Sequence, residues 1–310
     1  MFYPAIEPFE TGYLPVGGGH EIYYEICGNR AGKPALFVHG GPGGGCYADH
    51  RRLFDPSHYC IVLFDQRGCG RSRYDERLRE NTTQHLIADI EALREMIHAP
   101  QWDVVLGGSW GATLALIYAL THRLRVCALV LRGIFSGRQS EIDWLYRFGA
   151  SQLFPQEWEA FIGPLSEAER QDPVRAYHQR LTGADEDLQI AAARSWCRWE
   201  GSLLTLMPRG HYSSSDRHVI ALAQIETHYF VHGCFIAESE ILHRARELEG
   251  LPGILIQGRY DVVTPPTTAY ALHKAWAGSR LEIVPDAGHA THEAGILRQL
   301  VAATDHFATA

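Results

Sequence analysis

A glycine-flanked serine lies between a short apolar run and a helical pattern. The pentapeptide Gly107-Gly108-Ser109-Trp110-Gly111 follows the run Asp103 to Leu106, and a helix is predicted to begin near Ala112. Small residues beside the serine allow a sharp strand-to-helix turn, which holds the hydroxyl above a sheet at a helix N-terminus, where negative charge is favoured. The alternative is a glycine-containing turn with an idle serine. The flanking strand and helix favour Ser109 as a nucleophile, because the motif carries weight only in that context.

The segments around this turn alternate between predicted strands and helices. Short apolar runs that end in turns are typical of strands buried on both faces, and apolar residues repeated every three or four positions are typical of helices. The runs are Ala35 to Val38, Cys60 to Phe64, Asp103 to Leu106, Val126 to Leu131, Ile254 to Gln257 and Leu281 to Val284, and the helical patterns are Thr83 to Ile97, Ala112 to Leu120, Thr267 to Trp276 and His292 to Phe307. This order predicts an α/β fold with a mostly parallel sheet and helices on both faces.

Residues 135–243 interrupt the alternation. They contain four tryptophans among charged helical stretches and no clear buried strand. We therefore predict one catalytic domain built from residues 1–134 and 244–310, with a helical cap formed by residues 135–243. Within the cap, the polar segment His211 to Arg217 is predicted to be an exposed loop.

The composition excludes several classes of partner. The 310 residues carry a net charge of −8, which offers no electrostatic footprint for nucleic acid or for an anionic membrane. The apolar runs are far shorter than the ~18 residues of a membrane span, and the acidic, proline-containing start does not resemble a signal peptide. Seven scattered cysteines without a C-x-x-C pair argue against a disulfide framework or a zinc site. We expect a cytoplasmic protein that acts on a small molecule or a peptide.

A serine nucleophile needs a base and an acid, both expected after later strands in the order Ser, Asp, His. Asp261 follows the predicted strand Ile254 to Gln257, and His289 follows Leu281 to Val284. We predict a triad of Ser109, Asp261 and His289. Asp286 and His292 are the nearest alternatives for the acid and the base.

A second glycine-rich loop follows the first predicted strand. The loop from His39 to Gly45 has the sequence HGGPGGG, which exposes backbone N–H groups. A tetrahedral oxyanion requires two such donors, and we predict that Gly41 and Trp110 supply them. No Gly-Lys-Ser/Thr follows, and no G-x-G-x-x-G falls here, so neither a phosphate loop nor a dinucleotide site is expected.

Two acids in the cap stand among aromatic residues. Glu200 follows Trp196 and Trp199, and Glu226 precedes Tyr229 and Phe230. Carboxylates in such surroundings are costly unless they are paired. Either the cap's own arginines, such as Arg194 or Arg198, neutralise them, or they bind a cationic group of a ligand.

Together, these segments resemble the proline iminopeptidase (prolyl aminopeptidase) family of serine peptidases. The resemblance covers nearly the whole chain. It is carried by HGGPGGG (His39 to Gly45), FDQRGCGRS (Phe64 to Ser72), GGSWG (Gly107 to Gly111), LRGIF (Leu131 to Phe135), GRYD (Gly258 to Asp261), AGH (Ala287 to His289), Trp199-Glu200-Gly201 and Glu226 to Phe230. The motif G-x-S-x-G also occurs in lipases and esterases, whereas HGGPGGG and DQRGCGRS, together with a tryptophan after the serine, are specific to a much narrower group of proteins.

The resemblance implies an α/β-hydrolase fold and the release of N-terminal proline from peptides by the triad, without a metal or cofactor. It also implies that Glu200 and Glu226 receive the substrate's terminal amine and that Phe135 helps to shape the proline pocket. The resemblance aligns Leu145 with a position that is often tyrosine in the family, so no role is transferred to it. The rivals are another acyl hydrolase, such as an esterase or amidase, and a non-catalytic ligand-binding protein on the same fold. The sequence does not predict the oligomeric state.

Overall fold

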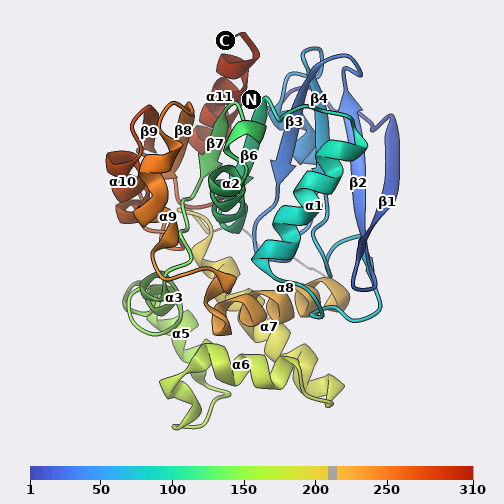
Figure 1. Cartoon of the computed structure of the whole chain (residues 1–310). Coiled ribbons are helices and arrows are strands. Elements are labelled where there is room, and N and C mark those ends of the chain that lie inside the picture. Colours follow the sequence, from blue (N-terminus) through green and yellow to red (C-terminus); the bar gives the residue numbers. More distant parts are fainter. Residues whose placement is uncertain (209–214, 310) are drawn as a thin grey trace.

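A computed structural model describes residues 1–208 and 215–309 of the chain. Nine strands in this part form one sheet in the order β1-β2-β4-β3-β6-β7-β8-β9, and β5 pairs with β2. Every pairing from β4 to β9 is parallel, whereas β2 pairs antiparallel with β1, β4 and β5. The prediction of a mostly parallel sheet between helices is confirmed (Figure 1).

All six predicted apolar runs contribute to strands, with ends that differ by up to three residues. The strands are β1 Glu10–Gly17, β2 His20–Gly28, β3 Lys33–Val38, β4 Tyr59–Phe64, β5 Arg73–Tyr74, β6 Val104–Gly108, β7 Leu129–Arg132, β8 Gly253–Gly258 and β9 Ser279–Val284. The antiparallel β1–β2 hairpin is not among the predicted strands. The side chains of β1 alternate between exposed and half-buried positions, so this strand has no continuous apolar run.

Helices cover both faces of the sheet. α1 (Thr83–Met96), α2 (Trp110–Thr121) and α10 (Pro266–Ala275) contribute to one apolar core, and α11 (Ala294–Thr309) with the short 3₁₀ helix η1 (Ala48–Leu53) contributes to the other. Side chains of β3 alternate between these cores: Leu36 belongs to the first and Phe37 to the second. A strand covered on both faces is therefore apolar at successive positions.

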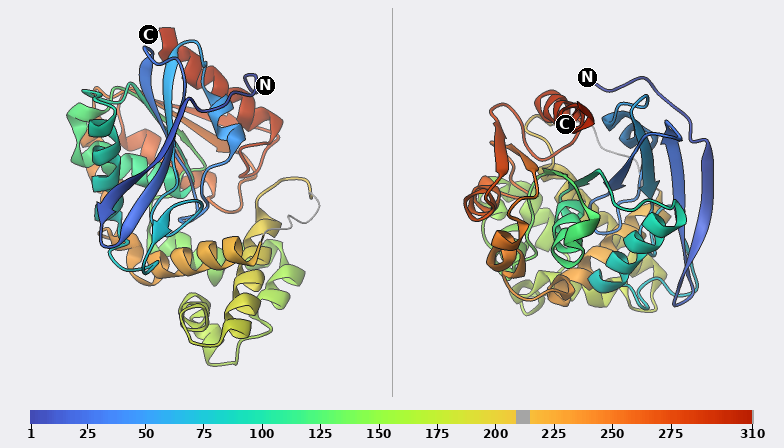
Figure 2. Two further views of the ribbon diagram at one scale, coloured as in Figure 1. Left: turned by 90° about the vertical axis from the view of Figure 1, so that its right-hand side faces the viewer. Right: turned by 45° about the horizontal axis from the view of Figure 1, so that its top comes forward.

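In the described residues, the regular elements between β7 and β8 are all helices, joined by loops. They comprise α3 Gln139–Tyr146, α4 Ala150–Leu153, α5 Pro155–Ile162, α6 Pro173–Leu181, α7 Glu186–Leu203, α8 Asp216–Val231 and α9 Glu240–Arg244, with the short 3₁₀ helices η3 Glu169–Gln171, η4 Gly233–Phe235 and η5 Ala245–Leu248. Helices α3 to α8 gather at one end of the sheet (Figures 1 and 2). α9 instead lies against α2, where Nη2 of Arg244 donates to the carbonyl of Leu120 at 3.0 Å.

The predicted loop His211 to Arg217 lies largely outside the described residues, which omit 209–214. At its end, Asp216 and Arg217 form the first turn of α8 rather than a loop. Ser215 caps this helix by accepting a hydrogen bond from the amide of His218. This cap explains why the helix begins inside a polar segment.

No single helix within residues 1–208 and 215–309 is long and apolar enough to cross a membrane. The helical stretches Asp216–Val231 and Gly233–Leu248 meet the length and composition limits together, with a bend of 81° between them.

Candidate active site

The turn from β6 to α2 presents Ser109 at the edge where the parallel strands end. Ser109 has φ 57° and ψ −122°, a strained conformation for a residue with a side chain. Its amide donates to the carbonyl of Arg132 on β7 at 2.8 Å. A Cβ on Gly107 would lie 2.2 Å from the carbonyl oxygen of Gly111, and one on Gly111 would lie 2.1 Å from that of Val38. Only glycine fits at these two positions, so they fix where the serine stands.

Asp261 and His289 lie side by side on the loops after β8 and β9. Oδ2 of Asp261 accepts a hydrogen bond from Nδ1 of His289 at 2.7 Å, and both side chains are buried. Asp261 also accepts bonds from the amide and hydroxyl of Thr264, at 2.8 and 2.9 Å, and from Nε2 of Gln257, at 3.0 Å. Because a carboxylate accepts hydrogen bonds, Nδ1 of the imidazole carries the proton in this contact. Nε2 of the neutral ring is then an acceptor, as a general base requires.

The two alternative residues both lie in the loop between β9 and α11. Asp286 is exposed, and His292 is partly buried. In the described part of the chain, the carboxylate that bonds to His289 is that of Asp261.

An arginine lies between the serine turn and the histidine. Nη1 of Arg132 lies 2.9 Å from Nε2 of His289 and donates to the same residue's carbonyl at 3.0 Å. A Cβ on Gly108 would lie 2.5 Å from Nη2 of Arg132, so the guanidinium also borders the turn. Its Nε has no hydrogen-bond partner in the residues that the structure describes. Burial lowers the pKa of Arg132 to about 10, and the charge of Asp261 opposes this only in part.

The glycine loop after β3 packs against the same turn. A Cβ on Gly40 would lie 2.9 Å from the carbonyl oxygen of Gly108 and 3.4 Å from Cβ of Ser109. Gly41 has φ 113°, and a Cβ there would meet backbone nitrogens at 2.7 and 2.8 Å. Trp110 is the first residue of α2, where amides have no partner within the helix. Backbone N–H groups of the loop and of the helix start therefore lie next to the serine.

The structure brings Glu200 of α7 and Glu226 of α8 together. The two carboxyl groups are hydrogen-bonded to each other, Nε1 of Trp196 donates to Glu226 at 2.7 Å, and the hydroxyl of Tyr146 donates to Glu200. Burial raises the pKa of both groups. The pKa of Glu226 rises further because the charge of Glu200 disfavours a second charge and because Glu200 accepts its proton. Burial and mutual repulsion therefore favour one proton for the pair, and the charged form of Glu226 is the more strongly disfavoured.

The arginines considered as partners for these acids do not reach them. Nη2 of Arg194 pairs with Asp216 at 2.8 Å. Among the described residues, no hydrogen bond or ion pair joins Arg194 or Arg198 to Glu200 or Glu226. Glu226 is buried and Glu200 is half-buried, and a carboxyl pair in this setting without a basic partner in the described residues favours the binding of a cation.

Aromatic rings connect Phe135 to the glutamate pair. The Phe135 ring lies 6.1 Å from that of Phe230, which lies 5.7 Å from the ring of Tyr146. Tyr146 in turn stacks on Trp196 at 4.3 Å. Leu145 is buried in the same core. Aromatic rings thus surround the two acids, which are polar groups in an otherwise apolar cluster.

Known proteins resemble this chain over its full length. Residues 33–295 match the alpha/beta hydrolase fold family. The chain is 48% identical to a probable proline iminopeptidase from Leptolyngbya boryana, over 99% of this chain and 97% of that one. It is 46% identical to a proline iminopeptidase from Arabidopsis thaliana, over 98% of this chain and 81% of the plant protein. The chain belongs to the proline iminopeptidase family.

Solved structures share the fold of this proline iminopeptidase family member at low sequence identity. The crystal structure of a proline iminopeptidase from Mycobacterium smegmatis superposes with a TM-score of 0.63 at 18% identity, covering 97% of this chain and 98% of that one. An esterase from Exiguobacterium antarcticum gives 0.67 at 16% identity, covering 97% of this chain and 100% of the esterase. Such likeness concerns the fold alone, since one fold serves many reactions.

Three residues at the site of this proline iminopeptidase family member were not predicted from its sequence. Arg132 lies next to His289, Gln257 holds Asp261, and Tyr146 binds Glu200. Arg132 and Gln257 are polar residues in two strands that are otherwise apolar, and both strands end at the edge that carries Ser109. A polar residue in an apolar strand that ends at this edge could therefore have indicated both residues. Tyr146 had no local signal, because its partner is 54 residues away in sequence.

Proposed function

We propose that this protein is a prolyl aminopeptidase, a serine hydrolase that releases N-terminal proline from peptides through an acyl-enzyme. Full-length identity of 42–48% to proline iminopeptidases supports the reaction. The Asp261–His289 hydrogen bond, at the edge that carries Ser109, is the observation that carries the mechanism.

In the proposed mechanism, Nε2 of His289 takes the proton of the Ser109 hydroxyl as that oxygen attacks the carbonyl carbon of the terminal residue. Asp261 holds the ring and stabilises its charged form. The amides of Gly41 and Trp110 bind the oxyanion. His289 then protonates the leaving amine, and water attacks the acyl-enzyme with His289 again as base, which releases proline. Arg132 must leave Nε2 before the first proton transfer, because one lone pair cannot accept both hydrogen bonds.

The cap supplies the aminopeptidase specificity. The single negative charge shared by Glu200 and Glu226 matches the single positive charge of a terminal ammonium group. Phe135 and the neighbouring rings contact the apolar faces of the proline ring. A peptide that continued beyond this amine would replace the charge by a neutral amide and add bulk, so internal prolines are excluded.

The cellular setting follows from the cysteines. All seven cysteines lie in the described residues and are free thiols. Free thiols are the usual state in a reducing compartment. We assign the protein to the cytoplasm, where its partners are small peptides with a free N-terminal proline rather than nucleic acid or membrane.

A panel of aminoacyl anilides with free and blocked N-termini tests this function. Prolyl anilide should be the preferred substrate, and N-acetyl-prolyl anilide should be nearly inert. Efficient cleavage of the blocked compound would leave only a general acyl hydrolase. Preference for short acyl esters would favour the esterase alternative, and failure of a serine-directed phosphonate to label Ser109 would favour a non-catalytic protein.

A further inference from the structure

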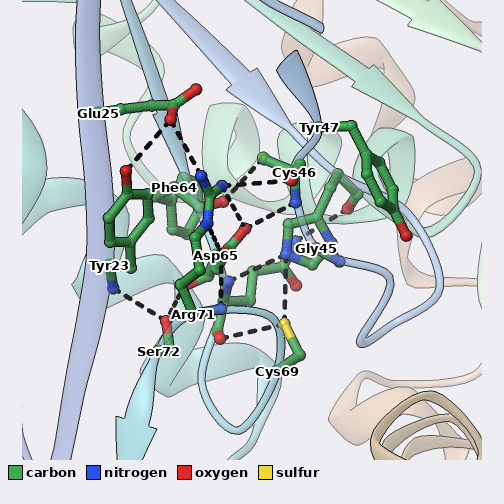
Figure 3. Close-up of polar contacts among 12 residues, drawn as sticks. Tyr23, Glu25, Gly45, Cys46, Tyr47, Phe64, Asp65, Cys69, Arg71 and Ser72 are labelled. Carbon is green, nitrogen blue, oxygen red and sulfur yellow. Dashed lines mark hydrogen bonds and ion pairs between the residues drawn. The ribbon is translucent and has the colours of Figure 1, made fainter. Parts of the chain in front are cut away.

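The segment Asp65 to Ser72 has no part in the proposed chemistry, although it is one of the most specific motifs of the sequence. It follows β4 and lies beside the glycine loop that follows β3 (Figure 3). Gln66, the second residue of this segment, is buried. Its contacts join the two elements that carry the proposed oxyanion donors.

The side chain of Gln66 forms a hydrogen bond at each end. Its Nε2 donates to the carbonyl of His39 at 2.9 Å, and its Oε1 accepts from Nε1 of Trp110 at 3.0 Å. An indole N–H can only donate and a carbonyl can only accept, so the orientation of the amide is fixed. A carboxylate would lack the donor, and an aliphatic side chain would lack both groups.

These two contacts reach both halves of the proposed oxyanion hole. His39 stands two residues before Gly41, which carries one donor, and Trp110 carries the other donor on its own backbone nitrogen. The indole of Trp110 is wholly buried and packs against Tyr229 with ring centres 4.8 Å apart. Gln66 therefore ties the glycine loop to the residue that follows the nucleophile.

Further hydrogen bonds from the segment Asp65 to Ser72 hold the glycine loop in place. The amide of Gln66 donates to Nε2 of His39 at 3.0 Å, and Nδ1 of that ring bonds to the carbonyl of Gly40 at 2.9 Å. Oδ1 of Asp65 accepts from the amide of Cys46 at 2.6 Å, and Oδ2 accepts from Arg71 at 2.8 Å (Figure 3). Asp65 and Arg71 thus anchor the loop to the sheet, whereas Gln66 alone among these three also bonds to the start of α2.

We propose that Gln66 is a positioning residue that sets the separation of the Gly41 and Trp110 amides and so keeps the oxyanion hole preorganised. This inference rests on the proposed function, because the oxyanion hole is part of it. Donors aimed at a developing charge act in the transition state, and a displacement of about 1 Å can cost about 100-fold in rate. The loss should therefore fall on kcat rather than on KM.

The test uses Gln66→Leu in the full chain, with prolyl anilide as substrate. We expect kcat to fall about 10- to 100-fold and KM to change less than about twofold. Prolinal, whose hemiacetal oxygen occupies the oxyanion hole, should bind weaker by the same factor as kcat, whereas free proline should bind as before. Equal weakening of both ligands, or an unchanged kcat, would overturn the proposal.

Two further variants keep the proposal testable if Gln66→Leu does not fold. Trp110→Phe removes the same hydrogen bond from the other side, so it should give a similar kcat loss, and the double variant should lose little more. Unchanged kcat in Trp110→Phe, or additive losses, would also overturn the proposal. Gln84→Leu is the matched control, because it removes a glutamine bond to the carbonyl of Phe235, outside both elements, and kcat should not change.

Covalent labelling separates this inference from the proposed function. A small uncharged fluorophosphonate also places an oxygen in the oxyanion hole, whatever the natural substrate. If wild-type protein is labelled at Ser109 but does not cleave prolyl anilide, the proposed substrate is wrong. A slower labelling rate in Gln66→Leu would still support Gln66 in that case, and an equal rate would refute it.

Discussion

Nη1 of Arg132 lies 2.9 Å from Nε2 of His289, the same nitrogen that the proposed mechanism assigns to the proton of Ser109. The proposed base is therefore held in a hydrogen bond to a cation. The guanidinium also lacks a carboxylate partner in the described residues, where no ion pair includes it. A substrate that enters the site must displace this contact before the serine can be activated.

Removing the guanidinium should make Ser109 more reactive toward probes that cannot displace it. A hydrogen bond to a charged group contributes roughly 1.5 kcal/mol or more, so Arg132→Met should be labelled about tenfold faster by a small uncharged fluorophosphonate. Stopped-time labelling followed by intact-mass measurement gives the rate. Arg198→Met is the control and should match wild type. Slower labelling of Arg132→Met would mean that the arginine assists the serine.

Loss of the nucleophile should abolish turnover without unfolding the protein. Ser109→Ala removes the attacking oxygen, whereas the turn is shaped mainly by Gly107 and Gly111. Such losses are on the order of 10⁶ in kcat. Anilide hydrolysis and thermal unfolding of the purified variant check both parts, and retention of a tenth of the activity would exclude Ser109 as the nucleophile.

The acid of the triad should be distinguishable from its neighbour in the next loop. Asp261→Asn leaves the shape but removes the acceptor that fixes the imidazole tautomer, so kcat should fall roughly 10⁴-fold. Asp286 is exposed, and Asp286→Asn should retain full activity. The reverse ranking of the two variants would move the acid to Asp286.

The two cap glutamates should differ in their effect on catalysis. Because the pKa of Glu226 is raised well above its ordinary value, partly by the charge of Glu200, a neutral glutamine is a closer substitute for Glu226 than for Glu200. A charge-assisted contact is worth roughly 1.5 to 3 kcal/mol, so Glu200→Gln should lower kcat/KM for prolyl anilide about 10- to 150-fold. Glu226→Gln should lose less. Cleavage of a small uncharged ester should barely change in either variant, and equal losses on ester and anilide would show that the acids only hold the cap together.

The shared proton also sets how stability depends on pH. The folded state raises the pKa of Glu226 above its ordinary 4.5, so between 4.5 and that raised value the folded state holds a proton that the unfolded chain releases. The free energy of unfolding should therefore decline as pH rises through this window. Glu226→Gln has no ionisable group at this position. Its free energy of unfolding, measured with urea between pH 5 and 8, should therefore decline less steeply than that of wild type. The exposed Glu157→Gln is the control, and a slope equal to wild type in Glu226→Gln would argue against a shared proton.

Local sequence predicted the elements that carry the site better than the contacts that complete it. Apolar runs identified β3, β4 and β6 because these strands are covered on both faces, whereas β9 is an edge strand whose run includes Glu282 and an exposed Ile283 and is therefore not buried on both faces as predicted. The β1–β2 hairpin was missed because half-exposed strands are signalled by alternation, and β1 is interrupted by glycine and proline.

Side-chain partners were harder to predict than positions. Ser109, Asp261 and His289 each follow a predicted strand, so topology alone brings their loops to one edge. The bond from Arg132 to His289 joins residues 157 positions apart, and the bond from Gln66 to Trp110 joins residues 44 apart. Such contacts depend on rotamers and packing, which no local pattern encodes.

The order of the chain has a consequence for synthesis. β8, the partner of β7, and the loops that carry Asp261 and His289 all follow the cap in sequence. A chain emerging from the ribosome therefore completes the serine turn early, while the outer edge of β7 stays unpaired until the whole cap has been translated. Throughout that interval the nascent protein has the proposed nucleophile without the proposed base. Translation order itself thus delays peptide cleavage until the final strands are in place.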